Sequence, residues 1–276
     1  MDYIGLDELL LSALKEDVGT GDITTLSCIP LQNRSSGRFI AKEDGVICGL
    51  EIAARVFHLI DSGICFEALC KDGDAIKKGD VIAKLEGASR SILTGERVAL
   101  NLMQRLSGTA TATALAVSEV AGTKARIVDT RKSTPGLRVL EKYAVRVGGG
   151  HNHRFNLSDG VLIKDNHISA AGGITNAVRA ARQAVPHVMK IEVETETLEQ
   201  VQEALSASAD IIMLDNMSNE LMAKAVELIA GRAITEASGN MGERSLAEVA
   251  ATGVDVISIG ALTHSVKALD ISLKLC

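Results

Sequence analysis

The sequence predicts an α/β protein whose larger part is a β/α barrel, and three observations lead to this prediction. Hydrophobic residues make up 46% of the 276 residues but aromatic residues only 2%, so the core must be aliphatic, which suits buried parallel strands. After Gly122, six strand-like segments alternate with helical patterns. The tightest repeats end their strands at Glu194, Asp215, Ser238 and Gly260, about 22 residues apart, a period typical of β/α barrels. Six units rather than eight are clear, and a doubly wound open sheet is the alternative.

The N-terminal part has a different pattern. Hydrophobic spacing predicts helices at residues 6–15 and 51–60, with short strands and turns from residue 38 onward and again over 65–85. Residues 92–120 are rich in Ala and Leu and predict a helix from residue 93 that is interrupted near 107–108. We expect one domain to give way to the next in this segment, with domains at 1–109 and 110–276.

The barrel units can be assigned in order from the alternation of the two patterns. The predicted strands are 125–130, 160–166, 189–194, 210–216, 233–238 and 255–260, the last of these being the final strand. Helices are predicted at 137–147, 174–185, 198–205, 220–229 and 246–251, and residues 266–273 close the chain.

Residues 129–167 form a cationic block within an acidic protein. They contain seven Lys or Arg, four Asp or Glu and three His, whereas the whole chain has a net charge of −6. A local excess of positive charge indicates a bound anion. The overall acidity and the scarcity of aromatic residues argue against nucleic acid as the partner.

The five cysteines show no CxxC spacing, and their odd number favours free thiols in a reducing compartment. The chain has no leader-like start and no apolar run of about 20 residues. We expect a soluble, cytoplasmic protein.

The candidate site residues follow from the rule that barrel strands point their C-terminal ends into the active site. Cations come first along the chain, carboxylates next and small residues last: Arg131, Lys132, Lys164, Glu192, Glu194, Asp215, Ser238, Gly239 and Gly260. The small-residue loops suit a phosphate, although they equally suit close packing of the loops. Glu194 and Asp215 suit Mg²⁺ or ribose hydroxyls, and the alternative is pairing with the nearby lysines. Which of Glu192 and Glu194 faces the site stays open.

His151 and His153 form an HxH pair beside Arg154. No third His or Cys is near in sequence, so a transition-metal site is disfavoured. A hydrogen-bonding or cationic role toward a carboxylate fits these residues better.

Several longer motifs occur in a fixed order from Glu96 to Ser265: GERVALNLMQRLSG, DTRKSTPGLR, KYAVRVGGGHNHRFNLSDGVLIKDNH, IEVE, IMLDN, EASGN and VDVISIGALTHS. Together they resemble the quinolinate phosphoribosyltransferase family, with weaker similarity at the N-terminal GDITT. The resemblance implies an N-terminal α/β sandwich, an incomplete β/α barrel and a homodimer in which each barrel is completed by the neighbour's N-terminal domain. It also implies transfer of phosphoribosyl from phosphoribosyl pyrophosphate to quinolinate with Mg²⁺, giving nicotinate mononucleotide, pyrophosphate and CO₂ on the route to NAD.

The resemblance also implies roles for the site residues. Arg131, His153, Arg154 and Lys164 would hold the two carboxylates of quinolinate, with Arg97 reaching over from the other subunit. Lys132 would lie nearer the pyrophosphate, and Glu194 and Asp215 would act with Mg²⁺. The 5′-phosphate would be held by Ser238, Gly239 and Gly260, together with His264.

Three alternatives remain at this point. Lys164 at a strand end also suits a Schiff-base lysine of a phosphate-binding aldolase. A related phosphoribosyltransferase-like protein of metal-transport operons is the second, and the HNHR and KDNH motifs speak against it. A non-catalytic binding subunit is the third.

Overall fold

The computed structural model describes residues 4–276, so residues 1–3 of the predicted first domain lie outside the described part. The chain forms two compact units. The first contains residues up to Ala112 together with Val139–Gly148 and Val266–Cys276, and the second contains Thr113–Arg138 and Gly149–Ser265. The sequence predicts a single boundary near residue 109, whereas two later segments of the chain belong to the first unit.

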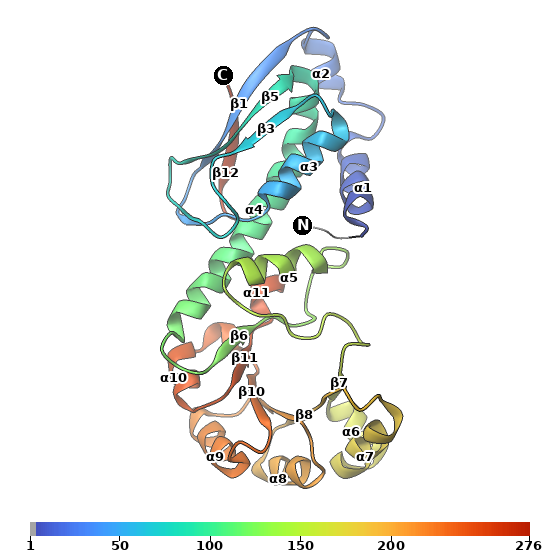
Figure 1. The fold of residues 1–276 in the computed structure, drawn as a ribbon, viewed down its shortest axis with the longest axis vertical. Helices are drawn as coiled ribbons and strands as arrows, with labels where there is room; N and C mark the ends of the chain where they lie inside the picture. The colour runs from blue at the N-terminus through green and yellow to red at the C-terminus, as the bar shows by residue number, and fades with distance from the viewer. Residues whose placement is uncertain (1–3) are drawn as a thin grey trace. The chain divides into compact units, whose positions relative to one another are not determined.

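The first unit is built on an antiparallel sheet with the strand order β12-β1-β5-β3 (Figure 1). Its strands are β1 (Arg34–Ala41), β3 (Cys65–Ala68), β5 (Val81–Ala88) and β12 (Ile271–Leu275), with a small pair β2 (Gly45–Val46) and β4 (Ala75–Ile76). Its helices are α1 (Leu6–Val18), α2 (Ile23–Cys28), α3 (Leu50–Ile60), most of α4 (Ser89–Glu119), and α5 (Arg138–Val147).

The core of the first unit departs from the purely aliphatic expectation. Phe39, Phe57 and Phe66 form a cluster with ring centroids 5.7 to 6.2 Å apart, joining β1, α3 and β3. Three of the four Phe residues of the chain therefore pack together where the sheet meets a helix.

The prediction that 255–260 is the last strand was wrong. Ile271, Leu273 and Leu275 alternate with polar residues, and this period of two forms β12, which pairs with β1 in the register Ile271↔Ala41. The segment is short and far in sequence from its partner, so its pattern alone did not show which sheet it would join.

The predicted interruption of the long helix near residues 107–108 was also wrong, because α4 is continuous. Ser107 accepts a hydrogen bond from the N–H of Cys48 and donates one to the Cys48 carbonyl. A Cβ on Gly108 would lie 2.2 Å from the carbonyl oxygen of Lys267. Both residues are therefore small because other segments approach the helix closely. Gly108 makes the helix less stable by about 1 kcal/mol than alanine would at the same position.

The second unit is a six-stranded parallel sheet with the order β6-β11-β10-β9-β8-β7. The strands are β6 (Arg126–Val128), β7 (Val161–Ile163), β8 (Ile191–Thr195), β9 (Ile211–Asp215), β10 (Ile234–Ser238) and β11 (Val256–Ser258). The first and last strands in this order, β6 and β7, are not paired with each other among residues 4–276, so the sheet is an incomplete barrel. The predicted fold class is confirmed.

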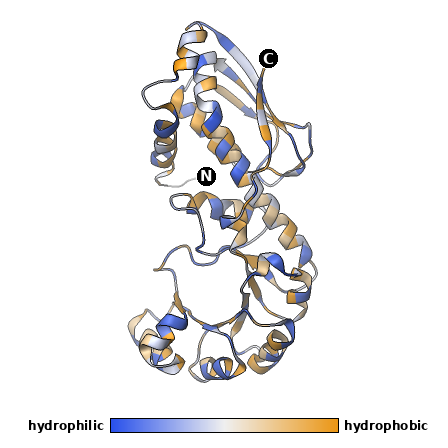
Figure 2. Cartoon of the chain, turned by 180° about the vertical axis from the view of Figure 1, so that it is seen from behind, coloured by the Kyte–Doolittle hydropathy of each residue, from blue (hydrophilic) through white to orange (hydrophobic). Residues whose placement is uncertain are grey.

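The helices of the second unit follow the strands, as predicted, with two differences. They are α6 (Asp165–Ala171), α7 (Ile174–Ala184), α8 (Leu198–Ser206), α9 (Asn219–Ile229), α10 (Leu246–Ala251) and α11 (Ala261–His264), with a 3₁₀ turn at Met241–Glu243. Helices α6 and α11 were not expected, and the helix predicted at 137–147 belongs to the first unit. In Figure 2 these helices carry both hydrophobic and hydrophilic segments, as expected for helices with one buried face.

Side-chain caps explain why three of these helices begin where they do. Thr197, Ser218 and Ser245 precede α8, α9 and α10, and each accepts a hydrogen bond from a backbone N–H of the first turn. Thr197 and Ser218 follow closely on the ends of β8 and β9, so the loops there are short, whereas a 3₁₀ turn separates β10 from Ser245. No helix within residues 4–276 has the length and apolar character needed to span a membrane.

Candidate active site

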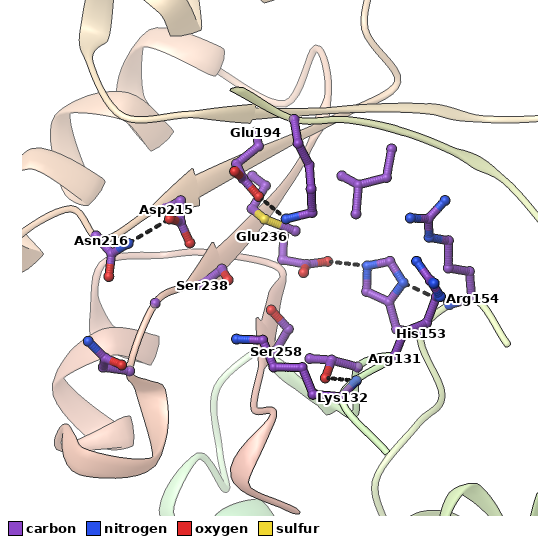
Figure 3. A pocket seen from close by; sticks show the side chains of 16 residues that line it. Arg131, Lys132, His153, Arg154, Glu194, Asp215, Asn216, Glu236, Ser238 and Ser258 are labelled. Carbon is purple, nitrogen blue, oxygen red and sulfur yellow. Dashed lines mark hydrogen bonds and ion pairs between the residues drawn. The ribbon is translucent and has the colours of Figure 1, made fainter. Parts of the chain in front are cut away.

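The C-terminal ends of the barrel strands surround a cavity of about 540 Å³ (Figure 3). Most of the predicted site residues line it: Arg131, Lys132, His153, Arg154, Lys164, Glu194, Asp215, Ser238 and Gly239. A second cavity of about 380 Å³ shares Lys132, Ser238 and Gly239 with the first and adds Gly260 and His264. The two cavities therefore bring together the predicted site residues of the second unit apart from Glu192, which lines neither of them.

Arg97 lies elsewhere. It is exposed on α4 in the first unit, and both cavities are lined by residues of the second unit alone. A role for Arg97 in a shared site stays a prediction.

One wall of the larger cavity is cationic. The side chains of Arg131 and Lys132 have no hydrogen-bond or ion-pair partner within the described residues 4–276. Arg154 is anchored by a 3.0 Å hydrogen bond from its guanidinium to the carbonyl of Gly160. Burial and the neighbouring charge of Arg131 lower the pKa of Arg154. A bound anion would relieve this repulsion, so the wall is suited to carboxylates or phosphates.

The loop that carries this wall is held at its base by Asp129, which is fully buried. The carboxylate of Asp129 accepts hydrogen bonds from the backbone N–H of His153 at 2.9 Å and from Asn152 at 2.5 Å. The N–H of Arg154 in turn donates to Nδ1 of His153 at 2.7 Å. Backbone and side chains of residues 152–154 are therefore fixed relative to the end of β6.

At the wall of the cavity, His153 meets two buried glutamates. Its Nε2 lies 3.3 Å from the carboxylate of Glu192 on β8 and 3.5 Å from that of Glu236 on β10 (Figure 3 shows the contact with Glu236). Burial alone lowers the pKa of His153, but hydrogen bonds and charges from both glutamates outweigh burial and raise it from 6.5 to about 10. Burial and the charge of Glu236 raise the pKa of Glu192.

Strand geometry decides which of Glu192 and Glu194 faces the site. Residues two apart on a strand share a face, and only depth separates them. Glu192 is 3% exposed and lies below the cavity, whereas Glu194 lines it. Both side chains point inward, in successive layers of the barrel.

The outer carboxylates are Glu194 and Asp215. Glu194 forms an ion pair with the ammonium group of Lys164, and Asp215 accepts a 2.6 Å hydrogen bond from the side chain of Asn216. Both carboxylates line the same cavity at the ends of adjacent strands (Figure 3). Two carboxylates with open space between them and the cationic wall are a donor set that fits Mg²⁺, which prefers oxygen ligands and keeps positions for substrate oxygens.

The small-residue loops after β10 and β11 are tightly packed. Gly239 has φ +93°, and a Cβ there would lie 2.3 Å from the side-chain oxygen of Asn216. A Cβ on Gly260 would lie 3.1 Å from both the Lys132 and the His264 side chains. The loops are thus closely packed, and Gly239 and Gly260 also line the smaller cavity.

Two residues of the site were missed by sequence reasoning. Glu236 sits two residues before the predicted strand end at Ser238, and only strand ends were considered. Asn216 adopts φ +53° and contacts both Asp215 and Gly239. The period of two in ITEAS could have found Glu236, since a glutamate at an inward position of a buried strand is unusual.

An incomplete β/α barrel whose strand ends gather cations, carboxylates and small-residue loops defines an enzyme that acts on phosphorylated or carboxylated compounds. Residues 22–107 match the N-terminal domain, and residues 109–274 the C-terminal domain, of quinolinate phosphoribosyl transferase. The chain belongs to this family.

Individual relatives agree with this assignment. The chain is 49% identical over 273 residues to the "Probable nicotinate-nucleotide pyrophosphorylase [carboxylating]" of Bacillus subtilis, covering 99% of this chain and 94% of that protein. It is 50% identical over 276 residues to the protein of the same name in Synechocystis sp., covering 99% and 93%. The crystal structure of NadC from Streptococcus pyogenes superposes with a TM-score of 0.94 at 45% identity, covering 100% of this chain and 99% of the other. The predicted enzyme class, pentosyl transfer by a carboxylating nicotinate-nucleotide diphosphorylase, is confirmed at the level of the family.

Proposed function

We propose that this protein transfers phosphoribosyl from phosphoribosyl pyrophosphate to quinolinate, with loss of CO₂, to give nicotinate mononucleotide in NAD biosynthesis. The observation that carries this proposal is the cationic wall opposite two carboxylates and two small-residue loops in adjoining cavities. A dicarboxylate needs clustered cations, and a phosphoribosyl donor needs both a phosphate site and groups that stabilise positive charge on the ribose ring.

The residue roles follow from the arrangement of the cationic wall, the two carboxylates and the small-residue loops. Arg131, Arg154 and Lys164 hold the two carboxylates of quinolinate, and His153 belongs to the same wall. Lys132, which lines both cavities, lies toward the pyrophosphate. The 5′-phosphate is held by Ser238, Gly239, Gly260 and His264.

Mg²⁺ is the cofactor we propose, held by Glu194 and Asp215 together with substrate oxygens. When bound, the ion would neutralise charge on the leaving pyrophosphate. Glu194 and Asp215 also stabilise the positive charge that grows on the ribose ring as pyrophosphate leaves. The ion pair of Lys164 with Glu194 keeps the two groups aligned before substrates bind.

The chemistry then needs positioning more than proton transfer. The ring nitrogen of quinolinate forms a bond to the anomeric carbon while the bond to pyrophosphate breaks. The ring nitrogen becomes cationic and accepts the electron pair released when the adjacent carboxylate leaves as CO₂, and the ring carbon takes up a proton. The cationic wall holds two anionic substrates together against their repulsion.

The aldolase alternative finds less support. A Schiff-base lysine must react as the free amine, whereas the Lys164 ammonium is paired with Glu194. Borohydride trapping with a carbonyl substrate gives no adduct at Lys164 on the present proposal, and a trapped adduct there would favour the aldolase.

The proposal is tested by incubating the purified protein with quinolinate, phosphoribosyl pyrophosphate and Mg²⁺. We expect nicotinate mononucleotide and CO₂ in equal amounts and loss of turnover with EDTA. Equal use of nicotinate, or no product, would overturn the substrate assignment.

We further propose a homodimer in which Arg97 of the partner subunit completes the site, and a cytoplasmic location in keeping with five unpaired cysteines. Arg97→Ala and Lys132→Ala chains, each inactive alone, should regain activity when mixed, because one of the two mixed sites would carry neither substitution. Mixed dimers verified by mass that stay inactive would count against a shared site.

A further inference from the structure

Two buried glutamates beside His153, Glu192 below the cavity and Glu236 in its lining, have no role in the reaction outlined above. Glu192 and Glu236 are each 3% exposed, and one carboxylate oxygen of each has no hydrogen-bond partner within residues 4–276. Buried carboxylates with unsatisfied oxygens cost stability, and such costs are usually tolerated where a function requires them.

The other carboxylate oxygen of each glutamate faces His153. Because Nδ1 of His153 accepts the N–H of Arg154, the proton of the neutral ring sits on Nε2 and points between the two carboxylates. The ring is therefore clamped on both sides: β8 and β10 hold Nε2, and the loop backbone holds Nδ1. Figure 3 shows the Glu236 carboxylate and the Arg154 backbone on opposite sides of the ring.

A metal ion in place of this proton is the competing explanation, since the three ligand atoms lie within 4.8 Å of one another. A histidine that binds a metal through one nitrogen normally donates a hydrogen bond from the other. Here Nδ1 faces a donor, so a metal on Nε2 would leave the ring with no proton at all. The hydrogen-bond pattern therefore favours a clamped imidazole over a metal centre.

The clamp has a consequence for the cationic wall. Strands β6 and β7 are the unpaired edges of the barrel, and the chain from Gly149 to Gly160 leads from one edge to the other. Its links to the sheet include one isolated bridge, Val128↔His151, the contacts of Asp129 at the end of β6, and His153. Of these, His153 alone reaches the interior strands β8 and β10, and Arg154 follows it directly in sequence.

We propose that Glu192 and Glu236 are positioning residues of the dicarboxylate site, which hold the His153 ring and through it fix the loop that presents Arg154. This inference rests on the proposed function, because it takes the ligand of Arg154 to be a carboxylate of quinolinate. In this account both glutamates act through His153, although Glu236 also lines the larger cavity.

The test is Glu236→Gln, which keeps the volume and removes the charge that holds Nε2–H. We expect the KM for quinolinate to rise about tenfold, as for loss of a charge-assisted hydrogen bond, while the KM for phosphoribosyl pyrophosphate stays within about twofold. In ¹⁵N-histidine spectra of the substrate-free protein, the His153 Nε2–H signal, identified by its loss in His153→Asn, should shift upfield in Glu236→Gln.

Asp255→Asn is the matched control. Asp255 is a half-buried carboxylate of the same barrel, bonded to Thr235 at the opposite ends of the strands. Its loss should lower thermal stability without a selective change in either KM. If Glu236→Gln does not fold, Glu236→Asp, which keeps the charge but shortens its reach, gives the same two readouts.

Parallel changes in both KM values, or an unchanged quinolinate KM with an unmoved His153 signal, would overturn the proposal. Stoichiometric metal that survives EDTA dialysis in the wild type and is lost in Glu236→Gln would overturn it in favour of a metal site. Absence of quinolinate turnover in the wild type overturns the proposed function instead, and the NMR comparison, which needs no substrate, then decides whether the clamp exists.

Discussion

Glu192 and Glu194 are two residues apart on one face of β8, yet the structure gives them different surroundings. Glu194 reaches the cavity, pairs with Lys164 and lies at the end of the strand next to that of Asp215. Glu192 lies one layer deeper, where it shares His153 with Glu236. The comparison shows that the strand period fixes which face a side chain occupies, whereas depth in the barrel decides whether it can meet a substrate.

The largest effect is expected from removing an outer carboxylate. Glu194→Gln should lower kcat by roughly 100- to 1,000-fold, because preorganised charge facing a developing cation is lost. Steady-state kinetics measures this, and Glu196→Gln is the control, since Glu196 directly follows β8 and is exposed. A kcat within threefold of the wild type would remove Glu194 from the reaction.

The contact of His153 with Glu192 and Glu236 should instead affect how the unfolding free energy depends on pH. The two glutamates raise the pKa of His153 above its ordinary value of 6.5, whereas the hydrogen bond that Nδ1 accepts from Arg154 favours the neutral ring and opposes that rise. The contribution of a protonated His153 ring to stability is therefore complete below pH 6.5 and is lost as the pH rises through its folded pKa. The raised pKa of Glu192 acts in the same direction. Between pH 6.5 and 10 the unfolding free energy of the wild type should fall by on the order of 2 kcal/mol more than that of Glu236→Gln.

Urea denaturation at a series of pH values measures this difference. If the unfolding free energies of the wild type and Glu236→Gln change in parallel with pH, then Glu192 and Glu236 do not hold a proton on His153. The matching series with Glu194→Gln should follow the wild type, since Glu194 does not contact His153 in any hydrogen bond or ion pair of the described residues.

A smaller effect is expected at the loop that supports Asp215. Gly239→Ala places a Cβ against Asn216, whose side chain bonds Asp215, and we expect the KM for phosphoribosyl pyrophosphate to rise about tenfold. Gly231→Ala is the control, because Gly231 also has a positive φ, +74°, but nothing within 4 Å of an added Cβ. Both variants carry the backbone penalty of about 1 kcal/mol, and only Gly239→Ala should alter substrate binding. Equal kinetics in the two variants would contradict a steric role for Asn216.

Much of the barrel was predictable because its signals are local. The strand ends at Asp215 and Ser238 agree with the structure, since short apolar runs followed by capped helices leave little freedom. Four of the seven cations of the 129–167 block likewise line one cavity, because parallel strands deliver consecutive strand ends to one edge: Arg131, Lys132, Arg154 and Lys164.

The predictions that were wrong concern features that depend on contacts between segments far apart in the sequence. Gly108 looks like a helix breaker until the carbonyl of Lys267 is placed against it, and β12 is only a short alternating run until β1 offers it an edge. The His153 clamp needed three segments at once, and nothing near His153 in sequence indicates Glu236.

The division of roles between Glu194 and Glu236 is tested most directly by calorimetric titration of quinolinate into the wild type, Glu194→Gln and Glu236→Gln. We predict that Glu194→Gln binds quinolinate at least as tightly as the wild type, because Lys164 is released from its ion pair, although turnover is nearly lost. We predict that Glu236→Gln binds about tenfold more weakly, because the loop carrying Arg154 is no longer fixed. Weaker binding in Glu194→Gln with unchanged binding in Glu236→Gln would contradict the account.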